Sequence, residues 1–324
     1  MKTPYLTPYL AFFFVLVACA GPTEDSDLVD TTDTVEPGDT DAPQSTDERC
    51  DNLPEAPLSI QEITGAVGYK GLAFDTEGHI VGSDGNDLLR VTYDGSVSPL
   101  AINVGEVEQL VYMSNGDLLA SSSWDNGLQR ITPAGTYETL MQDLSAYGIT
   151  LGPDEEVYAA DWRRVLRIDP DTGESSRFLQ TANGWDARIT TFDATYSRMY
   201  IGTVDNRGRI FFVDLDENME PLDYPRVFVE GVGSGWHDGL GMDACGNLYA
   251  IDYESAGLYR ITPEGDVSLY LDWSDDRSTY GHDLTWGSGI GGWRSDAIYV
   301  PLSEGGLKVM EIVIGIEEMP RMRR

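Results

Sequence analysis

Apolar residues in this chain of 324 residues fall in short runs separated by turns that are rich in glycine, aspartate and asparagine. The clearest example spans residues 235–252, where one run ends at a turn at 245–247 and a second run follows at 248–251. Within such runs, β-branched and aromatic residues alternate with other residues at a period of two, which is typical of β-strands. The pattern therefore predicts an all-β chain of short antiparallel strands.

This phrase occurs six times along the chain. The copies begin at Lys70, Glu108, Tyr147, Asp186, Asp238 and His282. Their spacings are 38, 39, 39, 52 and 44 residues, which leaves room for four strands in each unit of about forty residues. Six such units predict a six-bladed β-propeller of four-stranded antiparallel blades, because radial closure protects the sheet edges. We expect the unpartnered run at 58–63 to be the outer strand of the sixth blade and to close the ring.

The first nineteen residues do not share this pattern. Lys2 precedes an apolar run at 10–18 that is too short to span a bilayer as a helix and is typical of a secretory signal peptide. Residues 16–19 resemble the lipobox of bacterial lipoproteins, which implies a signal peptide at 1–19 and lipidation at Cys19. Ala20 follows the cysteine, so the resemblance favours the outer membrane of the cell envelope. A soluble secreted protein is the alternative.

Residues 20–52 are acidic and nearly free of apolar side chains, so they predict a disordered tether. The propeller is expected at 53–319 and a basic tail at 320–324. The net charge of −34 argues against a nucleic-acid partner, because phosphates would be repelled. We expect a monomer that contacts the membrane through its lipid anchor alone.

Two further cysteines remain once Cys19 is assigned to the anchor. Cys50 and Cys245 form an even pair in an oxidising compartment, which predicts a disulfide. Such a bridge would connect the start of the propeller to the repeat at 235–252. Two free thiols are the alternative.

The first strand of each propeller blade lines the central channel, so the first residues of the six copies are expected at one mouth of that channel. Three of them are carboxylates, at Glu108, Asp186 and Asp238. Two like charges about 4 Å apart cost about 4 kcal/mol at an effective dielectric of about 20, so a cation must accompany them. That cation is either a divalent metal ion (calcium foremost, otherwise manganese or zinc) or the ammonium group of Lys70.

The phrases at 157–161 and 246–252 resemble those of the senescence marker protein/gluconolactonase (regucalcin-like) family, and those of NHL-repeat propellers nearly as well. Members of the first family bind a divalent ion through a glutamate, an asparagine and an aspartate. The resemblance places the aspartate at Asp238 and the asparagine at Asp186. The glutamate position falls on Lys70, so Glu108 is the substitute ligand.

The resemblance implies hydrolysis of lactones or related esters, in which Asp238 is the catalytic residue that ligates the ion or helps to activate water. Contacts with a small-molecule or glycan ligand are expected from Lys70, Tyr147, Trp185, Trp236, His237 and His282. A non-enzymatic envelope module that binds a glycan or protein partner at the same mouth is the alternative. In a purely structural interpretation, the acids are rim residues that pair with Lys70 and Arg188.

Overall fold

The computed structural model describes residues 48–122, 127–181, 184–274, 281–303 and 307–320. They form six four-stranded antiparallel sheets, and the helical structure among them is the 3-10 helix η1 (Cys50–Asn52). Within these ranges, no helix has the length and apolar character needed to cross a membrane. The predicted all-β, six-bladed propeller is confirmed. The predicted signal peptide at 1–19, the predicted tether at 20–52 up to residue 47, and residues 321–324 of the predicted tail lie outside the described residues.

Five of the sheets consist of strands that follow one another in the chain. The first contains β2 (Leu72–Phe74), β3 (Ile80–Ser83), β4 (Leu88–Val91) and β5 (Val97–Ala101). The second contains β6 (Gln109–Tyr112), β7 (Leu118–Ser121), β8 (Leu128–Ile131) and β9 (Tyr137–Met141). The third contains β10 (Ile149–Leu151), β11 (Val157–Asp161), β12 (Arg164–Ile168) and β13 (Ser175–Gln180). The fourth contains β14 (Asp186–Phe192), β15 (Arg198–Val204), β16 (Ile210–Asp214) and β17 (Arg226–Val229). The fifth contains β18 (His237–Met242), β19 (Leu248–Asp252), β20 (Gly257–Ile261) and β21 (Val267–Asp272).

The sixth sheet combines strands from both ends of the propeller. Its order is β1 (Ser59–Thr64), β24 (Lys308–Val313), β23 (Ala297–Leu302) and β22 (Thr285–Trp286). The outer strand β1 pairs antiparallel with β24, with Ser59 opposite Val313 and Ile60 opposite Ile312. The run at 58–63 therefore provides the outer strand of this blade.

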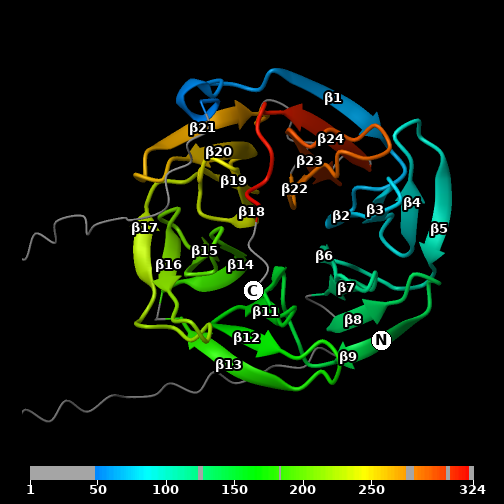
Figure 1. The fold of residues 1–324 in the computed structure, drawn as a ribbon, viewed down its shortest axis with the longest axis horizontal. Coiled ribbons are helices and arrows are strands. Elements are labelled where there is room, and N and C mark those ends of the chain that lie inside the picture. Colours follow the sequence, from blue (N-terminus) through cyan, green and yellow to red (C-terminus); the bar gives the residue numbers. More distant parts are fainter. Residues whose placement is uncertain (1–47, 123–126, 182–183, 275–280, 304–306, 321–324) are drawn as a thin grey trace, which may run out of the picture. The chain divides into compact units, whose positions relative to one another are not determined.

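Figure 1 shows the six sheets as blades around a central axis, with the first strand of each blade nearest to that axis. The second strands pack against neighbouring blades on both faces, so β11, β19 and β23 are buried at every position. Apolar runs without alternation are typical of strands covered on both sides. Equivalent tyrosines in these strands, Tyr158, Tyr249 and Tyr299, are fully buried.

The predicted disulfide is confirmed. Cys50, in η1, is bonded to Cys245 in the turn between β18 and β19, across 195 residues of sequence. In the chain-entropy description, closing a loop of that length stabilises the folded state by at most about 5 kcal/mol. The bridge ties the start of the described chain to the fifth blade.

Candidate functional site at the channel mouth

Six equivalent side chains at one mouth of the channel can be located from the hairpin turns that follow the inner strands. In each blade, one backbone N–H closes this turn by donating to a carbonyl across it. The donors are Asp75, Met113, Gly152, Asp193, Asp243 and Gly287. Five residues before these donors stand Lys70, Glu108, Tyr147, Arg188, Asp238 and His282. We call these six residues the mouth ring. It agrees with the predicted ring at five positions, and at the fourth it has Arg188 in place of Asp186.

The difference at the fourth position comes from a β-bulge. The pairing of β14 with β15 shifts between Ala187 and Ile189, so Arg188 is an extra residue without a direct partner. Strand β18 has the same irregularity between His237 and Gly239, and its extra residue is Asp238. Bulges redirect side chains out of the regular alternation. Asp186, by contrast, is the half-buried first residue of β14 and pairs with Val204.

The charges of the mouth ring are compensated within the ring. The Lys70 ammonium donates to Glu108 Oε1 at 2.8 Å, and both side chains are largely buried. Arg188 Nε donates to Asp238 Oδ1 at 2.5 Å, with 7 % and 4 % of the two side chains exposed. The carboxylates of Glu108 and Asp238 are therefore each held by a side-chain cation. Lys70 is the internal counter-ion that the sequence left open as an alternative to a metal.

His282 connects this charged pair to a hydroxyl group. Its Nδ1 lies 3.4 Å from Asp238 Oδ2, the carboxylate oxygen that Arg188 Nε does not contact. Its Nε2 lies 2.8 Å from Ser303 Oγ. Ser303 follows β23, whose last residue Leu302 bridges to Gly281, so the second strand of the blade delivers the serine to the histidine.

Aromatic rings cover the guanidinium of Arg188 on two sides. Its Cζ lies 3.1 Å from the centroid of Tyr147 and 5.1 Å from that of Trp236. The Tyr147 ring contacts Trp162 edge-on, and Trp162 is 39 % exposed. Such contacts stabilise a cation that has been removed from water. The mouth of the channel therefore places the rings of Tyr147 and Trp236 next to the positive charge of Arg188.

Two buried hydrogen-bond donors at the mouth lack partners among the described residues. They are Nη1 of Arg188 and Nε1 of Trp236. A buried polar group without a partner costs about 1–3 kcal/mol, so such groups are rare unless a water or a ligand satisfies them. A water molecule or a ligand oxygen that reached Arg188 Nη1 would satisfy it.

Two residues that were predicted to contact a ligand lie in the core. The Trp185 ring stacks on Phe211 at 4.1 Å and is 6 % exposed. His237 is fully buried, accepts from Thr203 N through Nδ1 at 3.2 Å and donates through Nε2 to Val232 O at 3.0 Å. Burial lowers the pKa of His237, so it stays neutral and holds backbone groups together. Trp185 precedes Asp186 and His237 follows Trp236 in the sequence, but both side chains lie in the core and do not face the channel mouth.

Asp283, which directly follows the mouth-ring residue His282 in the sequence, is a buried carboxyl group that the sequence analysis did not predict. Asp283 is 2 % exposed and accepts from Leu284 N, Leu72 N and Gln109 Nε2. Burial raises its pKa to about 8. Asp283 lines a channel cavity of about 110 Å³ formed by all six inner strands and Glu318. The signal available in sequence was an aspartate between His282 and the apolar run of an inner strand.

The other end of the channel is covered by the segment after β24. Met319 N donates to Met242 O, and Asp243 pairs with Glu318. Trp286 Nε1 donates to Ile316 O, which anchors the same segment to the sixth blade. The mouth ring therefore lies at the end of the channel away from this covering segment.

The predicted metal ligands Asp186, Asp238 and Glu108 are not brought to one point. Glu108 pairs with Lys70, and Asp238 pairs with Arg188. Asp186 precedes the ring residue Arg188 by two positions in the sequence and pairs with Val204 in β15. Two side-chain cations already neutralise the two ring carboxylates, and an ion would have to displace both. The donor set at the mouth thus does not fit a resident divalent ion.

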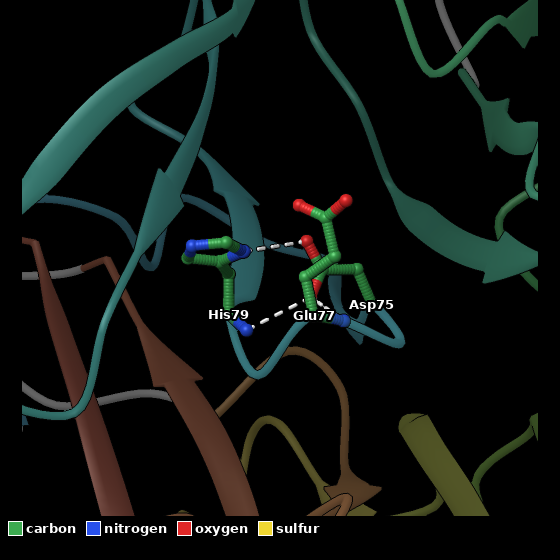
Figure 2. A group of neighbouring side chains, drawn as sticks. All are labelled: Asp75, Glu77 and His79. Carbon is green, nitrogen blue, oxygen red and sulfur yellow. Dashed lines mark hydrogen bonds and ion pairs between the residues drawn. The ribbon is translucent and has the colours of Figure 1, made fainter. Parts of the chain in front are cut away.

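Among the described residues, one group of three acidic or histidine side chains has ligand atoms within 4.8 Å of one another: Asp75, Glu77 and His79. Figure 2 shows them in the turn between β2 and β3, where His79 is hydrogen-bonded to Asp75 through its ring and its backbone. Asp75 also faces Arg90 at 3.5 Å. These groups could hold a cation, and nothing in the geometry specifies which one.

The same turn geometry recurs without a histidine. Asp193 Oδ1 accepts from Ser197 N and Arg198 N, and Asp243 Oδ1 accepts from Cys245 N and Asn247 N. Asp75 Oδ1 accepts from Glu77 N and His79 N in the same way. An aspartate that accepts from the backbone of its own turn is a common way to stabilise a tight loop. Asp75 is therefore first a turn-forming residue.

No protein-family model matches the sequence, and no curated protein matches it. Solved structures match its fold. A gluconolactonase from Xanthomonas campestris aligns with a TM-score of 0.65 at 14% identity, over 85% of this chain and 96% of that one. The calcium-binding protein regucalcin from Agrobacterium tumefaciens aligns with a TM-score of 0.59 at 17% identity, over 83% of this chain and 96% of that one. An auxiliary nutrient binding protein from Bacteroides thetaiotaomicron aligns with a TM-score of 0.59 at 15% identity, over 79% of this chain and 70% of that one.

The chain has the fold of the gluconolactonase and regucalcin propellers. At such low identity the likeness concerns the fold, which hosts many unrelated activities. The activity of this chain therefore depends on the residues at its own channel mouth.

Proposed function

We propose that this protein hydrolyses small lactones or related esters at the mouth ring. The observation that carries the proposal is the meeting, at Asp238, of the buried Arg188 guanidinium with its unpartnered Nη1 and of His282, which is hydrogen-bonded to Ser303. An ester carbonyl would offer an oxygen acceptor to Arg188 Nη1. Hydrolysis places negative charge on that oxygen in the transition state, where fixed donors stabilise it most. The gluconolactonase with the same fold supports this class of substrate.

In this proposal, the positive charge at the reaction centre comes from Arg188. A divalent ion, with calcium foremost and manganese or zinc as alternatives, was the expectation from family resemblance. The ion pairs of Glu108 and Asp238 instead favour a metal-free site. The cluster of Asp75, Glu77 and His79 lies in a turn at the far end of β2 from Lys70, so an ion bound there would have a structural role.

Purified full-length protein, assayed with a γ-lactone, a δ-lactone and p-nitrophenyl acetate, tests this function. Removing one donor that stabilises developing negative charge lowers turnover by about 100-fold or more, so Arg188→Gln should do so here. Arg207→Gln is the matched control, because Arg207 is exposed and pairs with Glu230 at 3.7 Å on the surface. No turnover on any of the three substrates, or equal turnover by Arg188→Gln and wild type, would reject the proposal.

A second function is favoured by the aromatic residues of the mouth. Trp162 is 39 % exposed and stands edge-on to Tyr147, and flat rings of this kind bind the apolar face of a sugar. The protein would then be an envelope module that binds a glycan without turning it over. Quenching of tryptophan fluorescence by oligosaccharides, lost in Trp162→Ala, together with no ester turnover, would support this function over hydrolysis. Location at the cell envelope through Cys19 remains a prediction.

A further inference from the structure

Three side chains from two blades lie in a row at the mouth, joined by one hydrogen bond and one ion-pair contact. Ser303 Oγ lies 2.8 Å from His282 Nε2, and His282 Nδ1 lies 3.4 Å from Asp238 Oδ2. We propose that Ser303 is the nucleophile of the ester hydrolysis, that His282 is its general base, and that Asp238 positions His282. This inference rests on the proposed function and names the residue that attacks the substrate.

The histidines of the chain show why His282 is the one suited to this role. His237 uses both ring nitrogens on backbone groups. His79 contacts the carboxylate of Asp75 and sits in a turn. Among the described histidines, His282 is the one that places a carboxylate at one ring nitrogen and a hydroxyl at the other. This is the connectivity by which a serine hydroxyl is activated as a nucleophile.

The backbone places these groups by two separate features. The β18 bulge turns Asp238 out of the regular register, toward the neighbouring blade. In that blade, His282 N donates to Pro301 O and Gly281 bridges to Leu302, which sets Ser303 beside the imidazole. A Cβ at Gly281 would lie 3.0 Å from Val300 and 3.1 Å from Ile251, so a larger residue there would press on these two buried side chains.

Arg188 determines which carboxylate oxygen faces the histidine. Its Nε binds Asp238 Oδ1, so Oδ2 is the oxygen that faces Nδ1 of His282. An N–H at Nδ1 that points to Oδ2 leaves the lone pair of Nε2 for the Ser303 hydroxyl proton. The same guanidinium carries Nη1, which has no partner among the described residues. Arg188 therefore positions Asp238 for His282 and also offers a hydrogen-bond donor to the substrate.

The reaction divides into two steps. Ser303 Oγ forms a bond to the carbonyl carbon while its proton moves to His282 Nε2. The bond from that carbon to the ester oxygen then breaks, and the Nε2 proton moves to the leaving oxygen. In the second step a water molecule attacks the acyl-serine, gives one proton to Nε2, and releases the acid as Ser303 Oγ recovers that proton. For a lactone, the leaving hydroxyl stays attached to the acyl group.

A fluorophosphonate probe tests the nucleophile without knowledge of the natural substrate. The serine oxygen displaces fluoride from phosphorus, and peptide mass spectrometry locates the label. We expect labelling at Ser303 in the full chain, loss of labelling in Ser303→Ala, and at least about 100-fold slower labelling in His282→Gln. Ser98→Ala and His79→Gln are the controls, since Ser98 is exposed on the outer strand β5 and His79 lies in the β2–β3 turn.

Melting temperatures of all variants establish that they are folded. No label on Ser303 in folded wild-type protein would overturn the proposal. If an ester is turned over and Ser303→Ala retains that turnover, the nucleophile assignment fails while the proposed function stands. If Ser303 is labelled but no ester is turned over, the nucleophile stands and the substrate class fails. Asp238→Asn should shift the pH profile of labelling, with partial rescue by Asp238→Glu, because a positioning carboxylate acts through the imidazole.

Discussion

The mouth of the channel and the hairpin turns at the far ends of the inner strands both contain buried or half-buried aspartates, but these are satisfied in different ways. In the turns, Asp193 and Asp243 accept from backbone N–H groups within five residues of themselves. At the mouth, Asp238 is held by Arg188, which is fifty residues away in sequence and on another blade. The turn aspartates shape a local loop, whereas the mouth aspartate depends on the packing of the fourth blade against the fifth. The guanidinium that holds Asp238 also carries Nη1, a buried donor without a partner among the described residues.

The largest effect is expected inside the channel, at Asp283. Its pKa is raised to about 8 from an ordinary value of 3.8. Between about pH 4 and pH 8 the unfolded chain loses this proton while the folded protein keeps it, so stability falls as pH rises. Asn at this position has no such proton. The free energy of unfolding of Asp283→Asn relative to wild type should therefore rise across this range, by at most about 6 kcal/mol.

Urea unfolding of both proteins at several pH values measures this difference. Below about pH 4 and above about pH 8 it should stay constant, because the two states then bind the same number of protons. Parallel stability curves for the two proteins across the whole range would show that Asp283 does not titrate as the buried environment predicts.

A direct comparison of the two regions uses Asp238→Ala and Asp193→Ala. Removing Asp238 leaves the buried Arg188 guanidinium without its partner, which should lower the free energy of unfolding by about 3–5 kcal/mol. Removing Asp193 frees two N–H groups in a half-exposed turn, which should cost about 1 kcal/mol. Chemical denaturation of both variants at pH 7 provides the measurement. Equal losses would remove the distinction between the two regions.

The disulfide sharpens the comparison, because Cys245 lies in one of the turns but bonds to a residue far away in sequence. Cys50→Ser with Cys245→Ser should lower the free energy of unfolding by about 2–5 kcal/mol, although the hydrogen bonds of Asp243 remain. Denaturation of the double variant, beside wild type under non-reducing conditions, gives this value. A loss well below 1 kcal/mol would indicate that the bridge does not restrict the unfolded chain.

Sequence periodicity was enough to predict the blades, because each strand and turn is encoded by neighbouring residues. Five positions of the mouth ring followed from the same repeat. Arg188 was missed as a ring member because a bulge adds one residue to β14 without changing its apolar pattern. Ser303, the proposed nucleophile, was not predicted because its partner His282 is 21 residues away in sequence, and a single serine has no signal in one sequence. Burial of Trp185 and His237 depends in the same way on packing between strands that the repeat does not describe.

Chelation tests the central claim, that the charges of the mouth are supplied by side chains. Ester and lactone turnover by the full chain is measured before and after treatment with EDTA, and again after calcium is added in excess. The account predicts equal turnover in all three states, because Lys70 and Arg188 hold Glu108 and Asp238 without an ion. Turnover that disappears with EDTA and returns with calcium would contradict it.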